Sequence, residues 1–220
     1  MAFDIKALNE KTSKGSLATL IIVCALLVVT AISLVIVVVN SKTTDKSTKL
    51  FESAFVQMLE FNEQTNVYSK QEMAPDIISD LDAVIASYPN TTAGARAVFY
   101  KGYVYYSTED YDQALEYFQY FIKKFSKSPL AGKAYYYISY CYSAKNDTDN
   151  AISILEEFEK KFKDSYYIPM FDLRLGELYE TKDKVTAINY YKKIIDREDT
   201  SSQKDLAVKR LTMLENDMSL

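Results

Sequence analysis

The chain contains no histidine, and this limits the chemistry that its side chains could perform. Histidine is the usual general base, the usual partner of a serine or cysteine nucleophile, and the commonest metal ligand. Catalysis would have to use pairs of carboxylates. The chain has such pairs close together in sequence: Asp80/Asp82, Glu109/Asp110 and Glu156/Glu157. Each falls on a predicted exposed helix face or turn, which favours a solvated surface, so we expect no enzyme and no catalytic residue.

Metal and cofactor motifs are also missing from the sequence. Asp147-Thr148-Asp149 begins like a calcium loop but lacks the required glycine and closing glutamate, so we interpret it as a turn and helix cap. No phosphate loop, dinucleotide fingerprint or cysteine metal pattern is present. Cys24 lies in an apolar run and Cys141 on a predicted helix, so we expect no disulfide, and Cys141 should be a small buried apolar residue. We expect no cofactor and no metal.

The charge balance gives little support for nucleic-acid binding. The formal net charge is −4, so the chain has no global basic field. Small lysine pairs such as Lys123-Lys124 are better interpreted as solvated faces of helices. Protein partners, and not nucleic acid, are therefore expected.

The elements that must position any binding surface are repeats. Residues 95–105 align with residues 132–142, with small and aromatic positions in register. The same offset recurs further on, where Ala114, Phe118, Phe121 and Phe125 align with Ala151, Leu155, Phe158 and Phe162 (151 − 114 = 37). A fixed period of this length is typical of stacked supersecondary units, and the i, i+4, i+7, i+11 spacing predicts helices.

A third copy places Gly176 and Tyr179 another 37 residues beyond Ser139 and Tyr142. A small residue, an aromatic residue three positions later, a polar turn, and then alanine and an aromatic residue form the tetratricopeptide pattern. Ile77, Leu81 and Val84 fit the same period one copy earlier, which predicts a degenerate first hairpin with a long loop at about 62–73. Residues 201–216 have the amphipathic pattern of a helix that caps a solenoid.

Leu17 to Val39 form 23 residues without a charge near the amino terminus. At about 1.5 Å per residue, a helix of this length crosses the roughly 30 Å hydrocarbon core. A cleaved signal peptide is the alternative, although its apolar region should be shorter and followed by a small-x-small cleavage site. A lipoprotein signal fits less well, because Val23 precedes Cys24. Lysines flank both sides equally, so charge does not assign the orientation.

The sequence therefore predicts an all-α fold. A single N-terminal transmembrane helix is followed by a tetratricopeptide-like α-solenoid of about four helical hairpins, the first degenerate, and a C-terminal capping helix. The expected divisions are a short N-terminal tail (1–16), the transmembrane helix (17–39), a linker (40–48) and the repeat domain (49–217). Within the domain we expect repeats at about 49–89, 95–129, 132–166 and 169–198 and the cap at 201–216.

The degenerate first hairpin, the junction Tyr-Pro-Asn-Thr-Thr-Ala-Gly-Ala-Arg-Ala at 88–97, and Tyr111-Asp112-Gln113-Ala114 resemble one bacterial group. It is the membrane-anchored tetratricopeptide family of the ancillary SecYEG translocon subunit, which shares its repeat domain with the periplasmic cell-division coordinator of the Tol-Pal system. The resemblance covers most of the chain. It implies a single-pass protein of the bacterial inner membrane whose repeat domain faces the periplasm and binds other proteins.

In tetratricopeptide stacks the first helix of each hairpin lines a concave groove. Counting from the small residue of each repeat, we expect this protein-binding groove to be lined by Arg96, Phe99, Tyr103, Tyr106, Lys133, Tyr136, Tyr140, Leu173, Glu177 and Glu180. Tyrosine gives a large contact area with a polar tip at low entropic cost, so the groove should bind an extended or helical segment of a partner. The alternative is that these rings are core between tightly stacked hairpins.

Three functions follow from this interpretation. The first is an accessory subunit of an inner-membrane complex such as the translocon, with translocon subunits, chaperones or clients as partners. The second is a structural scaffold of a large envelope assembly, a motor or cell-division complex, in which the repeat domain docks or forms a homo-oligomer. An envelope hydrolase is third, and no residue pattern supports it.

Overall fold

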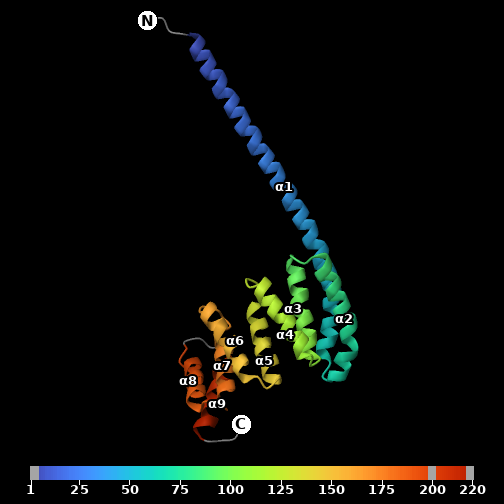
Figure 1. The fold of residues 1–220 in the computed structure, drawn as a ribbon, viewed down its shortest axis with the longest axis vertical. Helices are drawn as coiled ribbons and strands as arrows, with labels where there is room; N and C mark the ends of the chain where they lie inside the picture. The colour runs from blue at the N-terminus through green and yellow to red at the C-terminus, as the bar shows by residue number, and fades with distance from the viewer. Residues whose placement is uncertain (1–4, 198–201, 217–220) are drawn as a thin grey trace. The chain divides into compact units, whose positions relative to one another are not determined.

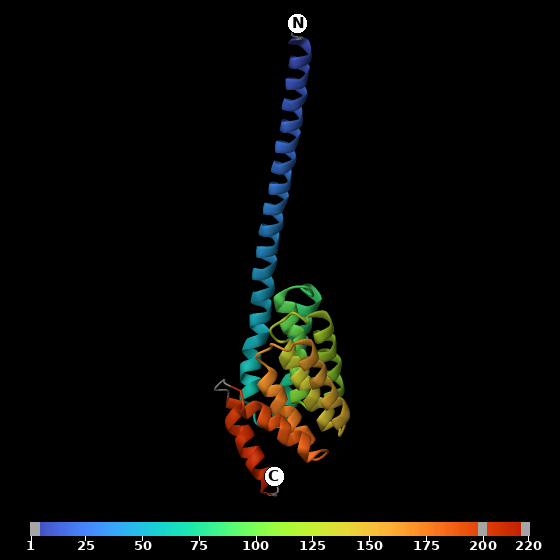
Figure 2. The same cartoon turned by 90° about the vertical axis from the view of Figure 1, so that its left-hand side faces the viewer.

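The computed structural model describes residues 5–197 and 202–216, and every regular element in these ranges is an α-helix (Figures 1 and 2). The nine helices and the lack of strands in this part of the chain confirm the predicted all-α fold. The chain divides into two units, residues 1–49 and 50–220. The expected start of the tail and the boundaries at 198–201 and 217 lie outside the described residues.

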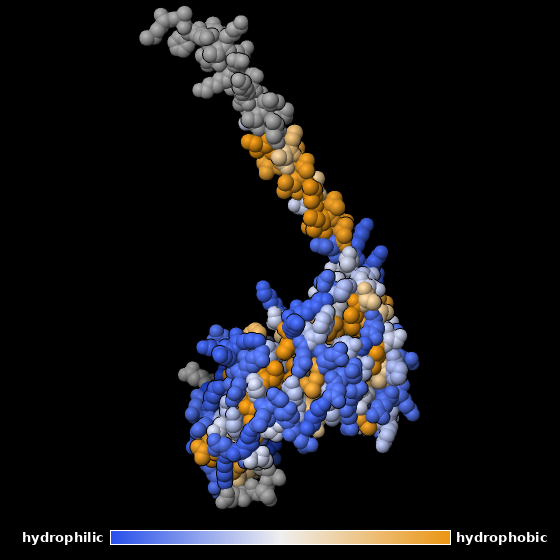
Figure 3. All heavy atoms as spheres, viewed as in Figure 1, coloured by the Kyte–Doolittle hydropathy of each residue, from blue (hydrophilic) through white to orange (hydrophobic). Residues whose placement is uncertain are grey.

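Helix α1 (Ile5–Glu63) contains the apolar segment. Its side chains from Ile22 to Val39 are exposed, and Figure 3 shows a continuous hydrophobic stretch along this part of the helix. The hydroxyls of Thr30 and Ser33 donate to carbonyls of their own helix at 2.9 and 2.8 Å, so neither needs water. The helix is long and apolar enough to cross a membrane, and an N-terminal signal sequence would meet the same standard. Residues 40–48, expected as a linker, are helical.

In the second unit, successive helices pack against one another in chain order (Figure 1). The part of α1 from residue 50 onward pairs with α2, and hairpins and a final helix follow. The bounds of these helices are α2 (Val67–Ser87), α3 (Thr92–Ser107), α4 (Tyr111–Lys124), α5 (Ala131–Ala144), α6 (Thr148–Lys161), α7 (Ile168–Tyr179), α8 (Lys184–Ile195) and α9 (Ser202–Glu215).

The helices of the second unit form two layers. We call residues 50–63 of α1 together with α3, α5, α7 and α9 the first helices, and α2, α4, α6 and α8 the second helices. Helix α3 packs on α5, and α7 packs on α9, whereas no two second helices in the described ranges pack on each other to the same extent. In these two pairs the first helices lie closer together than the second helices do, and we call their side the inner side of the stack.

Aspartates fix where the later second helices begin. Asp110, Asp147 and Asp183 each accept a hydrogen bond from a backbone N–H in the first turn of α4, α6 and α8. Such a cap satisfies an unpaired N–H and complements the helix dipole, and is typically worth about 1 kcal/mol. Hydrogen bonds from Asn150 and Thr186 lower the pKa of Asp147 and Asp183, respectively. The interpretation of Asp147 as a helix cap is confirmed.

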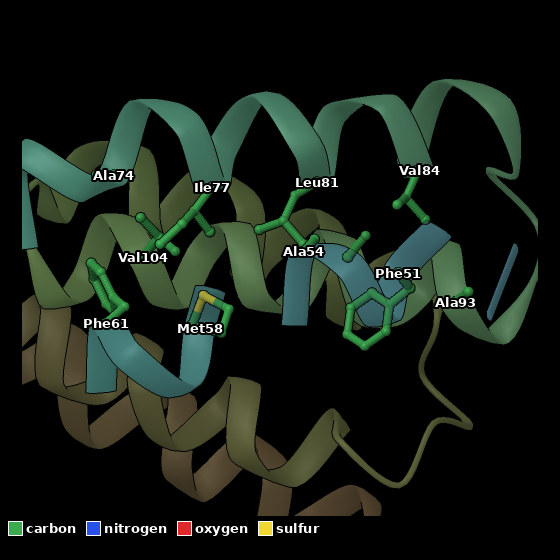
Figure 4. Packing of buried hydrophobic residues seen from close by; sticks show 11 residues of the cluster. Phe51, Ala54, Met58, Phe61, Ala74, Ile77, Leu81, Val84, Ala93 and Val104 are labelled. Carbon is green, nitrogen blue, oxygen red and sulfur yellow. The ribbon is translucent and has the colours of Figure 1, made fainter. Parts of the chain in front are cut away.

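The first hairpin is held by a core between α1, α2 and α3, shown in Figure 4. The expected long loop at 62–73 is wrong, because only residues 64–66 separate the two helices. Two features extend α2 toward its amino terminus. The Asn66 side chain accepts a hydrogen bond from the Tyr68 N–H at 2.8 Å, and Ala74 continues the buried face of the helix. The core residues are Phe51, Ala54, Met58, Phe61, Ala74, Ile77, Leu81, Val84, Ala93, Ala97 and Val104.

Candidate functional site

One row of side chains links the first helices along the inner side of the stack. We call this row the inner stripe. Its members lie on α3, α5, α7 and α9 or, for Glu180, directly after α7, and contact one another from repeat to repeat: Tyr103, Tyr106, Tyr136, Tyr137, Tyr140, Ser143, Arg174, Glu177, Glu180 and Arg210.

One position of the first helices α5 and α7 reaches back to the tyrosines of the preceding repeat. Tyr137 places its ring centroid 5.4 Å from that of Tyr103 and 4.9 Å from that of Tyr106. Arg174, which is 37 residues later, lies 3.9 Å above the ring of Tyr140. The contact between neighbouring repeats therefore comes from the same position in both repeats, but it changes from aromatic stacking to a cation over a ring.

The carboxyl-terminal part of the inner stripe is a charged network. Arg174 donates to Ser143 Oγ at 2.8 Å and to a carboxylate oxygen of Glu177 at 3.1 Å. Arg210, 36 residues after Arg174, donates to both carboxylate oxygens of Glu180 at 3.3 and 3.2 Å and lies 3.7 Å from Glu177. Each cation of this half thus already has a carboxylate partner within the chain.

The amino-terminal part of the inner stripe is aromatic and uncharged. Burial raises the pKa of Tyr106 to about 12, so its hydroxyl is protonated at neutral pH. Burial also raises the pKa of Tyr136, and the hydrogen bond with Tyr140 adds to this shift. The two hydroxyl oxygens are 3.0 Å apart, and either can donate. These rings can provide apolar contact and neutral hydrogen bonds, but no nucleophile or base.

The structure places the sequence-predicted groove residues in three environments. Phe99 and Leu173 are buried in the core, 3% and 8% exposed, so neither offers surface to a partner. Lys133 is exposed. The others are half-buried: Arg96, Tyr103, Tyr106, Tyr136, Tyr140, Glu177 and Glu180. Most of these lie together in the inner stripe, whereas Arg96 lies over Phe51 and Phe55 of α1.

Sequence reasoning missed the residues that join neighbouring repeats. Tyr137, Arg174 and Arg210 were not among the expected groove residues, yet they make the contacts described above. The 37-residue alignment contains the signal, since Tyr100, Tyr137 and Arg174 fall in register. A tyrosine replaced in register by arginine marks the point where the surface changes from neutral to charged.

A second polar cluster lies between α6, α7 and α8. Asp172 is fully buried at a position where the preceding repeats have Val98 and Tyr135. Lys193 pairs with Asp172 and also lies 3.3 Å from Glu159. Two acids therefore share one cation, and burial followed by the adjacent Asp172 raises the pKa of Glu159 to about 7. No group of His, Cys, Asp and Glu within the described residues could hold a metal ion.

Open hollows occur at the loops between hairpins, away from the inner stripe. One of about 520 Å³ is lined by residues 90–92, Ala95 and residues 124–129. A smaller one, of about 220 Å³, lies where the Tyr167 hydroxyl donates to the Pro129 carbonyl at 3.0 Å. Neither hollow brings together residues with catalytic or metal-binding chemistry.

Residues 78–129 and 99–166 match the tetratricopeptide repeat family model. A tetratricopeptide repeat protein from Parabacteroides merdae has a similar structure, with a TM-score of 0.57 and 12% identity over 79% of this chain and 61% of that one. A structure from a functional characterization of Pseudomonas aeruginosa pilF gives a TM-score of 0.52 and 14% identity over 80% of this chain and 86% of that one. Both structures resemble this chain in fold. No curated protein matches the sequence.

Proposed function

Because residues 78–166 carry tetratricopeptide repeats, we propose that the chain is a membrane-anchored scaffold for protein–protein interaction. The observation that supports this most directly is the aromatic half of the inner stripe. Tyr103, Tyr106, Tyr136 and Tyr140 are half-buried, so each keeps part of its ring at the surface. Tyrosines held in place by their neighbours provide contact area with little further loss of side-chain entropy, which is typical of protein-binding surfaces.

Helix α1 provides the proposed anchor. Its residues 22–39 are exposed in the structure, and the hydroxyl groups of Thr30 and Ser33 are satisfied within the helix, as lipid surroundings require. We infer one pass through a bacterial inner membrane with the repeat domain in the periplasm. The orientation rests on the resemblance to the ancillary SecYEG translocon family.

In this proposal the chain is an accessory subunit of an inner-membrane complex such as the translocon. The inner stripe binds segments of clients, chaperones or translocon subunits. The alternative is a structural scaffold of a motor or cell-division assembly. Val56 and Leu59 favour that alternative, because they are 65% and 52% exposed on the first helix of the stack, where another copy could continue it.

Chemical crosslinking of intact membranes followed by mass spectrometry tests the proposal and separates its two forms. Crosslinks to translocon subunits support the first form, and crosslinks to motor or division proteins, or between two copies of the chain, support the second. Tyr140→Ala should remove the crosslinked partners of the first form. Tyr120→Ala is the matched control, since Tyr120 is 44% exposed on the second helix α4. Equal loss in both variants would contradict binding by the inner stripe.

The mass of the mature protein and its attachment to the membrane test whether the apolar segment is an anchor. An uncleaved chain should have the intact mass of about 25 kDa and remain in the membrane after carbonate extraction. A shortened chain released as a soluble protein would identify the apolar segment as a signal sequence. Protease digestion of spheroplasts should remove the repeat domain, and its protection would contradict the periplasmic assignment.

A further inference from the structure

The two first helices that carry the tyrosines contain no aspartate or glutamate, although the whole chain has 30 acidic and 26 basic residues. Their cations are Arg96 and Lys101 on α3 and Lys133 on α5. Lys101 is buried and donates to both carboxylate oxygens of Asp82 on α2, at 2.6 and 2.7 Å. Its charge is therefore neutralised toward the second helices, which leaves Arg96 and Lys133.

Arg96 is held in place without a carboxylate partner. Its guanidinium carbon lies 4.2 Å from the ring centroid of Phe51 and 5.4 Å from that of Phe55. Within residues 5–197 and 202–216 it forms no hydrogen bond or ion pair, and the exposed Glu52 of α1 does not pair with it. A guanidinium stacked on aromatic rings keeps the N–H donors at its edge free. These donors are placed so that they can donate to both oxygens of one carboxylate.

Lys133 occupies the same position one repeat later, since 133 − 96 = 37. It is exposed and forms no ion pair among the described residues. Tyr136 and Tyr140 follow it by three and seven residues, so the three side chains share one face of α5. Lys133 thus lies beside the aromatic half of the inner stripe, and Arg96 occupies the equivalent position on α3, seven residues before Tyr103.

The other half of the inner stripe has the opposite property, because Arg174 and Arg210 are already paired with Glu177 and Glu180. Arg96 and Lys133 are therefore free to pair with a negatively charged partner, whereas the two arginines of α7 and α9 already pair with carboxylates of the chain. We infer that the aromatic half of the inner stripe binds an acidic protein segment, whose carboxylates lie against Arg96 and Lys133. This inference rests on the proposed function and names the class of partner. A single-stranded nucleic acid would suit it less well, since only two cations are unpaired on a chain of net charge −4.

Selection from a random dodecapeptide display library against the full chain in phosphatidylcholine nanodiscs tests the inference. The selected peptides should be enriched in Asp and Glu. The selected peptides, labelled with fluorescein, should bind the Arg96→Gln and Lys133→Gln chains with a Kd roughly fivefold higher than that of the unchanged chain. This is the effect of losing one exposed ion pair. Arg96→Lys keeps the charge but loses the paired donors of the guanidinium, so it should recover only part of the affinity. Lys123→Gln on α4, which removes the same charge elsewhere, should change Kd less than twofold.

The outcomes separate this inference from the proposed function. Selected peptides without acidic enrichment, or acidic peptides whose Kd ignores both substitutions, overturn the inference and leave the scaffold proposal standing. A selection that yields no binding peptide contradicts the scaffold proposal itself, and the inference with it. Tighter binding of a twelve-nucleotide oligo(dT) than of the selected peptides would assign the two cations to nucleic acid and overturn the inference.

Discussion

Gly176→Ala tests how the first and second helices of the last hairpin fit together. A methyl group at this position would lie 2.5 Å from Cε1 and 2.9 Å from Cζ of Tyr191, whereas carbon atoms normally approach to about 3.5–4.0 Å. The Tyr191 ring has little freedom to move away. It is fully buried, and its hydroxyl donates to the carboxylate of Glu180, which also binds Arg210.

The expected loss of stability follows from two opposing contributions. Forcing an extra methyl group into a packed core costs about 1–3 kcal/mol, and replacing glycine by alanine in a helix returns roughly 0.5–1 kcal/mol. Gly176→Ala should therefore lower the free energy of unfolding by about 1–2 kcal/mol. Gly102→Ala is the matched control at the equivalent position, since the nearest Phe118 atoms are 3.1 Å away and must give only a few tenths of an ångström. We expect it to lie within about 0.5 kcal/mol of the unchanged protein.

The third equivalent position supports this reasoning. Ser139 already carries a side chain there. The residue 37 positions after Phe118 and 36 positions before Tyr191, where the last repeat is one residue shorter, is the smaller Leu155. Urea unfolding in detergent, followed by circular dichroism, gives the free energy of unfolding of the unchanged chain, Gly176→Ala and Gly102→Ala under the same conditions. Tyr191→Leu should cost less stability in the Gly176→Ala background than alone, because the clash is then removed. Gly176→Ala as stable as Gly102→Ala would refute the packing described for this hairpin.

Further predictions concern the charged clusters and Cys141. Burial and Asp172 raise the pKa of Glu159 from 4.5 to about 7. The stability contributed by its proton is therefore complete below about pH 4.5 and lost as pH rises through 7. The free energy of unfolding measured between pH 5 and 8 should show this loss, and Glu159→Gln should flatten the profile. An equally steep profile in Glu159→Gln would contradict the assignment. Arg174→Leu removes hydrogen bonds to Ser143 and Glu177 and should lower the free energy of unfolding by about 2 kcal/mol, measured in urea; an unchanged value would mean that the network does not stabilise the stack. Cys141 is buried and its pKa is raised by burial to about 12, so alkylation followed by mass spectrometry should modify it only after unfolding, and rapid modification of the folded chain would disprove its burial.

The repeat spacing was sufficient to predict the helical architecture. The positions of Ala114, Phe118 and Phe121 and their copies 37 residues later predicted the buried faces of α4 and α6, because one helical period defines one buried stripe. The cap at Asp147 was also predicted, because Asp147-Thr148-Asp149 lacks the glycine and glutamate of a calcium loop and aspartate is a typical cap.

The contacts between neighbouring repeats could not be predicted in the same way. Periodicity identifies which positions correspond, but it does not tell which side chain bridges the gap between first helices. Tyr137 and Arg174 occupy one such position with different chemistry, and Phe99, expected in the groove, is buried among Phe118, Phe121 and Tyr137 instead. The long loop expected at 62–73 was wrong because the local cap at Asn66 had not been considered.

Site-specific photo-crosslinking shows whether partners bind at the first helices. A benzoylphenylalanine is placed at Lys133 on the first helix α5 or, as the matched control, at Lys123 on the second helix α4, and both chains are irradiated in native membranes. Both lysines are exposed, so either probe can be accommodated without disturbing the core. We expect a protein adduct from position 133 and none from position 123. An adduct from position 123 alone would contradict binding by the first helices.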